Sequence, residues 1–501
     1  MKEAKQISNA CKICGLCPGN LCDNLSQEMS LNYDYPETFP NTYTGCRFTS
    51  DAMDCALPIA IDSHSGCSYN CLYCFSNNLQ RAPDRNPQLL QKAIKQGSFY
   101  SEYPIRQLER FLARDAKDKQ SLAMYKLLDA GVPVQLGALG DPFDELERHS
   151  GWAKKAIPLF IKYGVPVRVG TKGGAVLQDK EYLKLFEKSP EQFWFAFSII
   201  SNSDELITAV DLKAPNTTER IRAMKALTNM GCKASLRFRP FLPGISDSYP
   251  GEPEAWKVLI DRCNEAGARA ISFEYIFLAS YLTPRQEIMQ RLMLKTMRNP
   301  NFAKDWHGQS KAGESCRRGG RTLKYEQTKK VRDYVHTLGW LFGCSDPHFK
   351  EWNDTGCCCG MPETGDAWFS RWSRRQMTEV IVQGRRALDK GEVILFNYDD
   401  WKPEWSHETQ ASNMINVSNW HNYRRMKYVT FGDHMRKKWN DPKHPRNPYQ
   451  YFDKVLIPVG IDKNTNDLVY QFVGWDEKTQ RPNKTILKHS DLLHDITNSK
   501  K

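Results

Sequence analysis

The chain has 501 residues, 40% of them hydrophobic, and a formal net charge of +12. That is enough chain and apolar surface for one large barrel with additions, or for two to three domains. No stretch approaches the ~18 consecutive apolar residues of a membrane span, and the first residues lack the apolar core of a secretion signal. The composition therefore excludes a membrane partner, predicts a cytoplasmic protein, and is compatible with an anionic partner such as a nucleic acid.

Sixteen cysteines in such a chain predict bound metal, because a reducing compartment does not sustain a disulfide framework. The first group is Cys11, Cys14, Cys17 and Cys22, in a segment with few apolar residues. Four thiols this close together favour either an auxiliary 4Fe–4S cluster or a structural zinc site, and their spacing leaves both open.

The next cysteines form the stretch around which the chain is organised. Cys67, Cys71 and Cys74 have the spacing C-x3-C-x2-C and follow the apolar run of residues 56–61. Three thiolates on one short loop can bind three irons of a 4Fe–4S cube and leave the fourth iron without a protein ligand. The alternative is a structural zinc loop, but such a loop usually has four protein ligands.

This loop, with Tyr73 before its third cysteine, resembles the signature of the radical S-adenosylmethionine (radical SAM) superfamily. The resemblance implies that SAM binds the open iron through its amino and carboxylate groups. It also implies reductive cleavage of SAM to methionine and a 5′-deoxyadenosyl radical, with a reductant such as flavodoxin or ferredoxin as a partner.

After the loop, β-rich apolar runs alternate with helix-period stretches, which predicts parallel strands joined by right-handed crossovers. One such stretch, residues 218–227, ends at Met230-Gly231, where the glycine is the expected helix stop. Six β/α units result, and six is the number in the barrel that the resemblance implies. We therefore expect an α/β fold, a partial (β/α)6 radical SAM barrel with a Cys-rich N-terminal segment and a C-terminal α+β extension. The six expected strands are residues 56–61, 132–139, 165–171, 193–200, 233–239 and 268–275.

Polar residues stand where these strands end, and parallel barrels keep their active sites at the carboxyl ends of strands. Gly137 and Asp141, in the form Gly-x-x-x-Asp-Pro-aromatic, resemble the spore-photoproduct-lyase subgroup of the superfamily. The resemblance implies that Asp141, or carbonyl groups of its loop, accept from the SAM ammonium, and that Ser198 donates to the SAM carboxylate. Arg237 or Arg239 is a further candidate for that carboxylate, because a guanidinium fits it bidentately.

Residues 282–367 contain a second group of cysteines, three of them adjacent and flanked by glycines that permit a tight turn. They are candidates for a second metal site, and a cysteine-rich packed turn is the alternative. The candidate ligands are Cys344, Cys357, Cys358 and Cys359. Cys46 and Cys55, which precede the central loop, are expected to be ordinary buried thiols.

Residues 368–501 interleave basic and aromatic side chains, which suits phosphate contact with base stacking; a solvated face over an aromatic core is the alternative. Near the end, residues 455–459 and 468–474 flank a turn-rich stretch and predict a hairpin. The chain therefore divides into a Cys-rich segment, a barrel, a Cys-containing extension and a basic, aromatic region, at residues 1–55, 56–281, 282–367 and 368–501.

The sequence supports three hypotheses of function. The first is a radical SAM enzyme, lyase or transferase, that modifies or repairs a nucleic-acid base. The second is radical SAM modification of a peptide, a protein or a small metabolite, with auxiliary Fe–S clusters. The third is a binding or regulatory module whose barrel no longer turns over, against which the intact three-cysteine loop argues. The cofactors expected for an enzyme are one 4Fe–4S cluster, SAM, and a second Fe–S cluster or zinc.

Overall fold

The computed structural model describes residues 46–49, 54–63, 67–69, 71–74, 103–117, 119–145, 147–279, 289, 293, 316–407 and 430–483. The N-terminal group of cysteines lies outside these described residues; its members are Cys11, Cys14, Cys17 and Cys22. In the part of the chain that the structure describes, no helix is both long and apolar enough to cross a membrane.

A single sheet of eight strands forms the centre of the protein. Seven of its strands are parallel, and β1 pairs antiparallel at one edge. The α/β class and the partial parallel barrel are therefore as predicted. The strand order is β1 (Arg47–Phe48), β2 (Ile59–Ile61), β3 (Val134–Leu136), β4 (Val167–Thr171), β5 (Phe193–Ser198), β6 (Lys233–Phe241), β7 (Ala270–Tyr275) and β10 (Leu341–Cys344).

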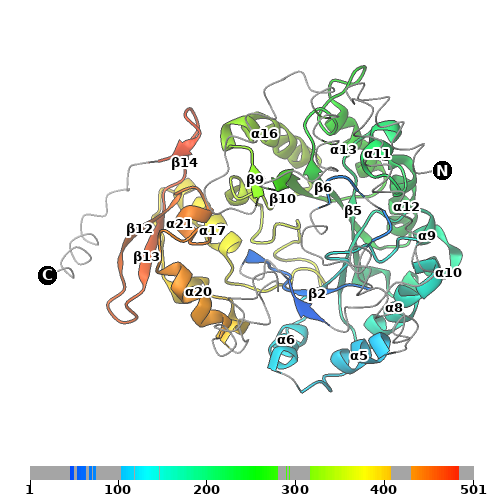
Figure 1. Ribbon diagram of the computed structural model, residues 1–501, viewed down its shortest axis with the longest axis horizontal. Coiled ribbons are helices and arrows are strands. Elements are labelled where there is room, and N and C mark those ends of the chain that lie inside the picture. Colours follow the sequence, from blue (N-terminus) through cyan, green and yellow to red (C-terminus); the bar gives the residue numbers. More distant parts are fainter. Residues whose placement is uncertain are drawn as a thin grey trace, which may run out of the picture.

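Helices follow the strands in sequence and form an arc around the sheet (Figure 1). Shorter helical pieces, α7 (Glu147–Ser150), α9 (Ala175–Gln178) and the 3-10 turn at Pro190–Gln192, complete the connections. The helices of the arc are α5 (Tyr103–Leu112), α6 (Lys119–Asp129), α8 (Trp152–Lys162), α10 (Lys180–Phe186), α11 (Asp204–Val210), α12 (Thr217–Asn229), α13 (Ala255–Glu265) and α16 (Arg321–Thr337).

Helix α12 shows how the sequence sets these boundaries. The Asn216 side chain accepts from the Glu219 backbone N–H at 2.8 Å, and the Glu219 carboxylate accepts from the Asn216 N–H at 2.8 Å. This reciprocal cap satisfies two backbone donors that the first helical turn leaves open. The helix stops at Met230, and Gly231 follows with φ of +100°, a conformation that favours glycine. The predicted stop is confirmed.

The seventh parallel strand, β10, was not among the six predicted strands. Its register on β7 pairs Gly343 with Ser272 and Cys344 with Phe273. Helix α16 precedes this strand and returns the chain to the sheet. Four residues that include a glycine give too weak a β signal to read from sequence alone. The region after residue 281 therefore contributes a strand to the barrel sheet.

The two faces of this sheet differ in chemistry. Successive strand residues alternate between faces, and on the face toward the helices β4 places Val167 and Val169 in the main hydrophobic core. On the opposite, inner face the register brings Gln135 beside Arg168, and Ser198 beside Arg237. These inner side chains are polar yet mostly buried, with Gln135 8% and Arg168 5% exposed. Because buried polar groups need partners, the inner face is where a bound group is expected.

A segment from the C-terminal half of the chain closes the amino ends of the strands. Trp194, at the start of β5, packs edge-on against Phe369 with ring centroids 5.4 Å apart. The Ser373 N–H donates to the Ala56 carbonyl at 2.9 Å, next to the start of β2. A compact second core results, of Ala56, Leu57, Trp194, Ala270, Cys357, Cys359, Met361, Phe369 and Trp372.

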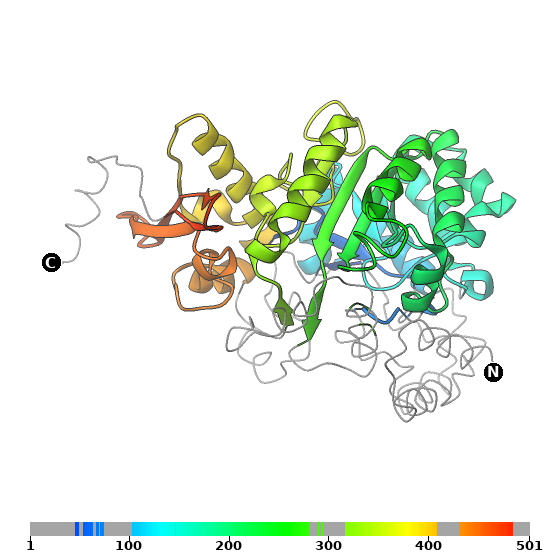
Figure 2. The same ribbon diagram turned by 90° about the horizontal axis from the view of Figure 1, so that it is seen from above.

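The C-terminal elements lie to one side of the barrel (Figure 2). The predicted hairpin is present: β12 (Leu456–Ile461) pairs antiparallel with β13 (Leu468–Phe472), which also pairs with β11 (Leu395–Phe396). Helix α17 (Met377–Asp389) packs against β13. The other C-terminal helices are α18 (Tyr398–Trp401), α20 (Phe431–Trp439) and α21 (Pro448–Tyr451), with 3-10 turns at Lys350–Trp352 and Glu404–His407. Two small ribbons complete the fold, β8 (Phe277–Ala279) with β9 (Cys316–Arg318), and β14 (Trp475–Asp476) with β15 (Arg481–Pro482).

The described tryptophans of residues 368–501 belong mainly to a core. Trp401 and Trp439 are 1% and 0% exposed, and their rings are tilted by 34° with centroids 4.9 Å apart. Trp372 and Trp405 are 4% and 2% exposed. None of these four rings is free to stack on a base, so among the described residues they fit the aromatic-core alternative.

Candidate active site

The three-cysteine loop follows β2 and is docked first against the loop after β3. The Asp144 carboxylate accepts from the Ser68 N–H at 2.7 Å and from the Ser68 hydroxyl at 2.9 Å. The Tyr69 hydroxyl donates to the Phe143 carbonyl at 3.0 Å. All four residues are buried, so water does not compete for these bonds. These bonds hold the start of the cysteine loop, next to Cys67, against the loop that follows β3.

The other flank of the loop is fixed by the segment after β5. Cys71 forms an isolated antiparallel bridge with Asp211. The Leu72 N–H donates to the Val210 carbonyl at 2.9 Å, and the Lys213 N–H donates to the Tyr69 carbonyl at 3.0 Å. The thiols are therefore carried by a backbone that is held on two sides, at the carboxyl ends of parallel strands, where barrel enzymes keep their active sites.

In this loop the negative charge of one cysteine raises the pKa of the cysteine before it. Burial raises the pKa of Cys67, and the charges of Asp144, Asp141 and Cys71 raise it further. Burial also raises the pKa of Cys71, with the charges of Asp211 and of Cys74 adding to it. Such thiols stay protonated unless a cation compensates them, and bound iron provides that compensation.

The donor set fits a cluster better than a single ion. Among the described residues, no group of three or more His, Cys, Asp or Glu side chains is arranged to hold a single metal ion. In a 4Fe–4S cube each thiolate binds a different iron, so the three sulfur atoms need not converge on one point. Cys67, Cys71 and Cys74 share one short loop, and the binding of a cluster by them stays a prediction.

A fully buried ion pair stands behind the loop. The Arg220 Nη2 lies 2.8 Å from the Asp211 Oδ2, and neither side chain is exposed. Arg220 also donates through Nη1 to the Ser198 carbonyl and through Nε to the Pro215 carbonyl, both at 2.7 Å. This one guanidinium therefore ties the end of β5 to the segment that grips the cysteine loop.

Lys172 adds a second positive charge beside the loop. Its Nζ lies 5.3 Å from the centre of the Tyr73 ring, a cation–π contact. Burial acts to lower the pKa of Lys172, but the charges of Cys71 and Asp211 outweigh burial and raise it. The pKa of Tyr73 is raised by burial first and then by Asp211. Two cations, Lys172 and Arg220, thus favour a negatively charged group at the cysteines.

The loop after β3 is shaped by two carboxylates. Asp141 accepts from the Phe143 N–H at 3.0 Å, from the Thr171 hydroxyl at 2.8 Å and from the Lys172 N–H at 2.5 Å. Burial raises its pKa to about 6, although these hydrogen bonds oppose the rise. Asp62 accepts from the N–H groups of Leu139 and Gly140 at 2.8 and 3.2 Å. Both oxygens of Asp141 are thus engaged in the protein, and its contact with SAM stays a prediction.

Glycine is required at the start of this loop. Gly137 has φ of +78°, and a Cβ there would lie 2.5 Å from the Gly170 carbonyl oxygen. Gly170 in turn approaches Gly137, since its own Cβ would lie 2.9 Å from the Gly137 carbonyl oxygen. The two backbones touch, so the loop sits directly on the end of β4.

The predicted carboxylate binders lie together on the inner face. Arg237 Nη1 donates to the Ser198 hydroxyl at 3.0 Å. Arg239 instead forms an ion pair with Glu274, through Nε at 3.1 Å and Nη2 at 2.8 Å. Burial and the charges of Arg239 and Arg168 lower the pKa of Arg237 to about 9. Of the two arginines, Arg239 is the one held by a carboxylate, and the contact of Arg237 with SAM remains a prediction.

Sequence reasoning missed Arg168 and Glu274 as members of the site. The signal for Arg168 was present, because a charged residue inside the apolar run Val-Arg-Val marks an inner-face position. Glu274 gave no such signal, since its partner Arg239 comes from another element of the fold.

The structure does not bring the four cysteines of the later candidate site together. Gly343 faces the turn formed by Cys357, Cys358 and Cys359. A Cβ added to Gly343 would lie 2.6 Å from the Cys358 carbonyl oxygen. Cys344, the next residue of β10, therefore points to the opposite face of the sheet. Instead, hydrogen bonds from Cys357 and Cys358 lower the pKa of Cys359, against its burial. Metal binding by these cysteines stays a prediction.

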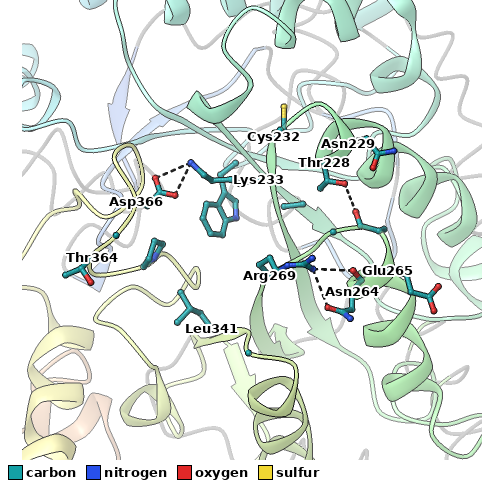
Figure 3. Close-up of a pocket in the computed structure, with 18 residues that line it drawn as sticks. Thr228, Asn229, Cys232, Lys233, Asn264, Glu265, Arg269, Leu341, Thr364 and Asp366 are labelled. Carbon is teal, nitrogen blue, oxygen red and sulfur yellow. Dashed lines mark hydrogen bonds and ion pairs between the residues drawn. The ribbon is translucent and has the colours of Figure 1, made fainter.

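A pocket of about 750 Å³ lies elsewhere, at the amino ends of β6 and β7 (Figure 3). Lys233 reaches across it to Asp366 at 2.9 Å, and Arg269 is linked to Asn264. Its cation–carboxylate pair is complete, and it lies at the end of the strands remote from the cysteine loop. The pocket is therefore not part of the candidate site.

The structure is similar to solved structures of radical SAM enzymes. One is spore photoproduct lyase complexed with dinucleoside spore photoproduct, at 15% identity and a TM-score of 0.38, covering 60% of this chain and 79% of that one. Another is SuiB of Streptococcus suis bound to S-adenosylmethionine, at 13% identity and a TM-score of 0.29, covering 48% of this chain and 46% of that one. No protein-family model and no curated protein matches the sequence. Values this low decide nothing about function, which depends on the geometry of the site.

Proposed function

We propose that this chain is a radical SAM enzyme whose cluster is bound by Cys67, Cys71 and Cys74. The observation that carries the proposal is the three-thiol loop itself, fixed by hydrogen bonds on both flanks at the carboxyl ends of a parallel sheet. When bound, the 4Fe–4S cluster supplies the electron that cleaves SAM to methionine and a 5′-deoxyadenosyl radical.

The residues of this chain bind, orient and shield. Asp62 and Asp141 hold the loop that faces the SAM amino group, and the Ser198–Arg237 pair offers donors to its carboxylate. Lys172 and Arg220 supply positive charge behind the thiolates. The amino ends of the strands are closed by packed aromatic rings, which limits the entry of water from that side.

The proposed substrate is a nucleic-acid base, which the enzyme modifies or repairs. The net charge of +12 and the motif resemblance to the spore-photoproduct-lyase subgroup support this. The buried tryptophans of the C-terminal region lend it no support. If the substrate is a nucleic acid, binding of DNA or RNA weakens steeply as salt rises. Absent or salt-insensitive binding would favour the alternative, a peptide, a protein or a small metabolite.

The experiment that tests the proposed activity compares three proteins, each purified and reconstituted without oxygen. Reduced wild type is expected to convert SAM to 5′-deoxyadenosine, and the Cys67→Ala/Cys71→Ala/Cys74→Ala variant to form none. The matched control is Cys232→Ala/Cys263→Ala, because both cysteines are buried in the core away from the loop. Activity in the loop variant would rule the proposal out, and lost activity in the control would show that the effect is not specific.

An auxiliary metal centre at Cys11, Cys14, Cys17 and Cys22 remains part of the proposal, as a second Fe–S cluster or zinc. Metal binding would itself order a segment with few apolar residues. Deleting residues 1–30 should remove that metal while the loop cluster remains. Iron, zinc and sulfide measured per chain before and after the deletion check this, and unchanged metal content would show that the four cysteines bind none.

A further inference from the structure

Three arginines face the inner side of the barrel sheet. Arg168 lies on β4 and pairs in register with Gln135 on one side and Trp194 on the other. Arg237 and Arg239 lie two residues apart on β6, so their side chains share one face. Burial lowers the pKa of Arg237, and the charges of Arg239 and Arg168 lower it further.

Of these three arginines, Arg239 has a carboxylate partner, because Glu274 accepts two hydrogen bonds from it. Arg168 donates instead to a neutral group, the Gln135 side chain. A buried charge is costly unless an opposite charge compensates it, so an anion beside Arg168 would stabilise the site.

Arg168 has the donors that such an anion would use. Its side chain is 5% exposed, and its Nη1 donates to the Gln135 Oε1 at 3.2 Å. Within the described part of the chain, its Nε and Nη2 have no hydrogen-bond partner. The guanidinium reaches along the strand, with Nη1 3.9 Å from where a Cβ on Gly170 would lie. Two unsatisfied donors of one planar fork match the two oxygens of a carboxylate or a phosphate.

We propose that Arg168 binds one anionic group of the substrate, a phosphate or a carboxylate, on the inner face of the barrel. Arg168 is the second residue of β4, and its guanidinium reaches along the strand to the level of Gly170. Because the Ser198–Arg237 pair is the one assigned to the SAM carboxylate, the anion at Arg168 belongs to the substrate. This inference rests on the proposed function, which places a substrate beside SAM in the barrel.

The test uses reconstituted full-length protein titrated with inorganic phosphate and with acetate, followed by calorimetry. Wild type is expected to bind one of them saturably, and Arg168→Gln to weaken it at least about tenfold, as loss of a charged hydrogen-bond pair predicts. Arg168→Lys, which keeps the charge but lacks the fork, should fall between the two and guards against misfolding of the first variant. Arg269→Gln is the matched control, because Arg269 is exposed and lies at the amino end of β7; it should bind as wild type does.

Thermal unfolding provides a second measurement, and its result would differ if Arg168 had only a structural role. In the absence of anions Arg168→Gln should be no less stable than wild type, since it relieves an unpaired buried charge. Phosphate or acetate should raise the melting temperature of wild type and not that of the variant. A variant that is strongly destabilised and binds phosphate normally would show a structural role and overturn the inference.

Adding SAM at a saturating concentration shows whether the bound anion occupies a substrate site or the site of the SAM carboxylate. If phosphate or acetate still binds in the presence of SAM, the site is separate and the inference stands. If SAM displaces it, Arg168 belongs to the SAM carboxylate site and the inference is overturned. A protein that cleaves SAM but binds neither anion refutes this inference alone. A protein that binds the anion but never cleaves SAM refutes the radical SAM assignment and leaves the anion site in place.

Discussion

The two ends of the parallel sheet are closed by different kinds of residues. At the amino ends, aromatic rings and thiols pack into a small core, in which Phe369 is fully buried against Trp194. At the carboxyl ends, a loop of thiols rests on a buried ion pair between Asp211 and Arg220. The core at the amino ends contributes mainly to the stability of the fold. The arrangement at the carboxyl ends places charged side chains around the candidate active site.

Because the two ends differ in this way, mutations at one end are expected to change a different property from mutations at the other. A truncation at the amino end removes apolar contact and should lower stability without touching the chemistry. A change at the carboxyl end alters electrostatics near the thiols and should change cofactor binding or potential. The following variants test whether the two ends are independent.

The largest effect is expected from the buried ion pair. Arg220→Met should cost about 3–5 kcal/mol of unfolding free energy, because it leaves the Asp211 carboxylate buried without its partner. It should also lower the iron bound per chain, since the Asp211 segment grips the cysteine loop. Denaturant unfolding and iron analysis measure both. The double variant Asp211→Asn/Arg220→Met should recover most of the loss, and failure to do so would show that the pair is not the cause.

A similar loss of stability, without loss of function, is expected at the amino end. Phe369→Ala should cost about 3–5 kcal/mol, the usual range for truncating a fully buried phenylalanine. Iron content and SAM cleavage per folded chain should not change. Phe369→Leu is the milder control, at under about 1.5 kcal/mol. Lost SAM cleavage at temperatures where the variant is folded would mean that the two ends are coupled.

A smaller effect is expected at the loop after β3. Asp141→Ala should weaken SAM binding about tenfold, since three hydrogen bonds to this carboxylate hold the loop on β4. Iron content should stay the same, because Asp141 is not a thiolate ligand. Equilibrium binding of SAM to the reconstituted protein measures this, with Thr171→Val, which removes one of the three bonds, as a milder comparison. Unchanged affinity would assign the role to the backbone of the loop alone.

The smallest effect is expected from Lys172. Lys172→Met should lower the reduction potential of the cluster by on the order of 40 mV, about 1 kcal/mol for a one-electron couple, because it removes a cation beside the thiolates. Redox titration of the reconstituted protein checks this. Lys233→Met is the matched control at the amino end, where the lysine pairs with Asp366, and should leave the potential unchanged. A rise in potential for Lys172→Met would contradict the electrostatic account.

Much of the fold could be read from local pattern. Each of the six predicted strands overlaps an observed strand, since apolar β-rich runs and helix stops are encoded over short stretches of sequence. Strand β10 was missed because four residues with a glycine carry little signal. The placement of Cys344 away from Cys357, Cys358 and Cys359 could not be read either, because only the pairing of β10 on β7 decides which face Cys344 takes.

The site was predictable to the extent that its residues are close in sequence. The spacing of Cys67, Cys71 and Cys74 was enough to name the loop. What holds the loop was not, because Asp144 and Asp211 come from distant loops that only the folded sheet brings to it. The placement of Arg168 on the same face as Arg237 and Arg239 could not be read either, because it depends on how β4 and β6 pair with β5 between them.

The open fourth iron is the central claim, and electron paramagnetic resonance of the reduced protein with and without SAM tests it most directly. A cluster held by only three cysteines should bind SAM at its free iron, so its signal should change when SAM is added. The Cys67→Ala/Cys71→Ala/Cys74→Ala variant should show no SAM-dependent change. A wild-type signal that is the same with and without SAM, or a SAM-dependent change that survives in the variant, would contradict the account.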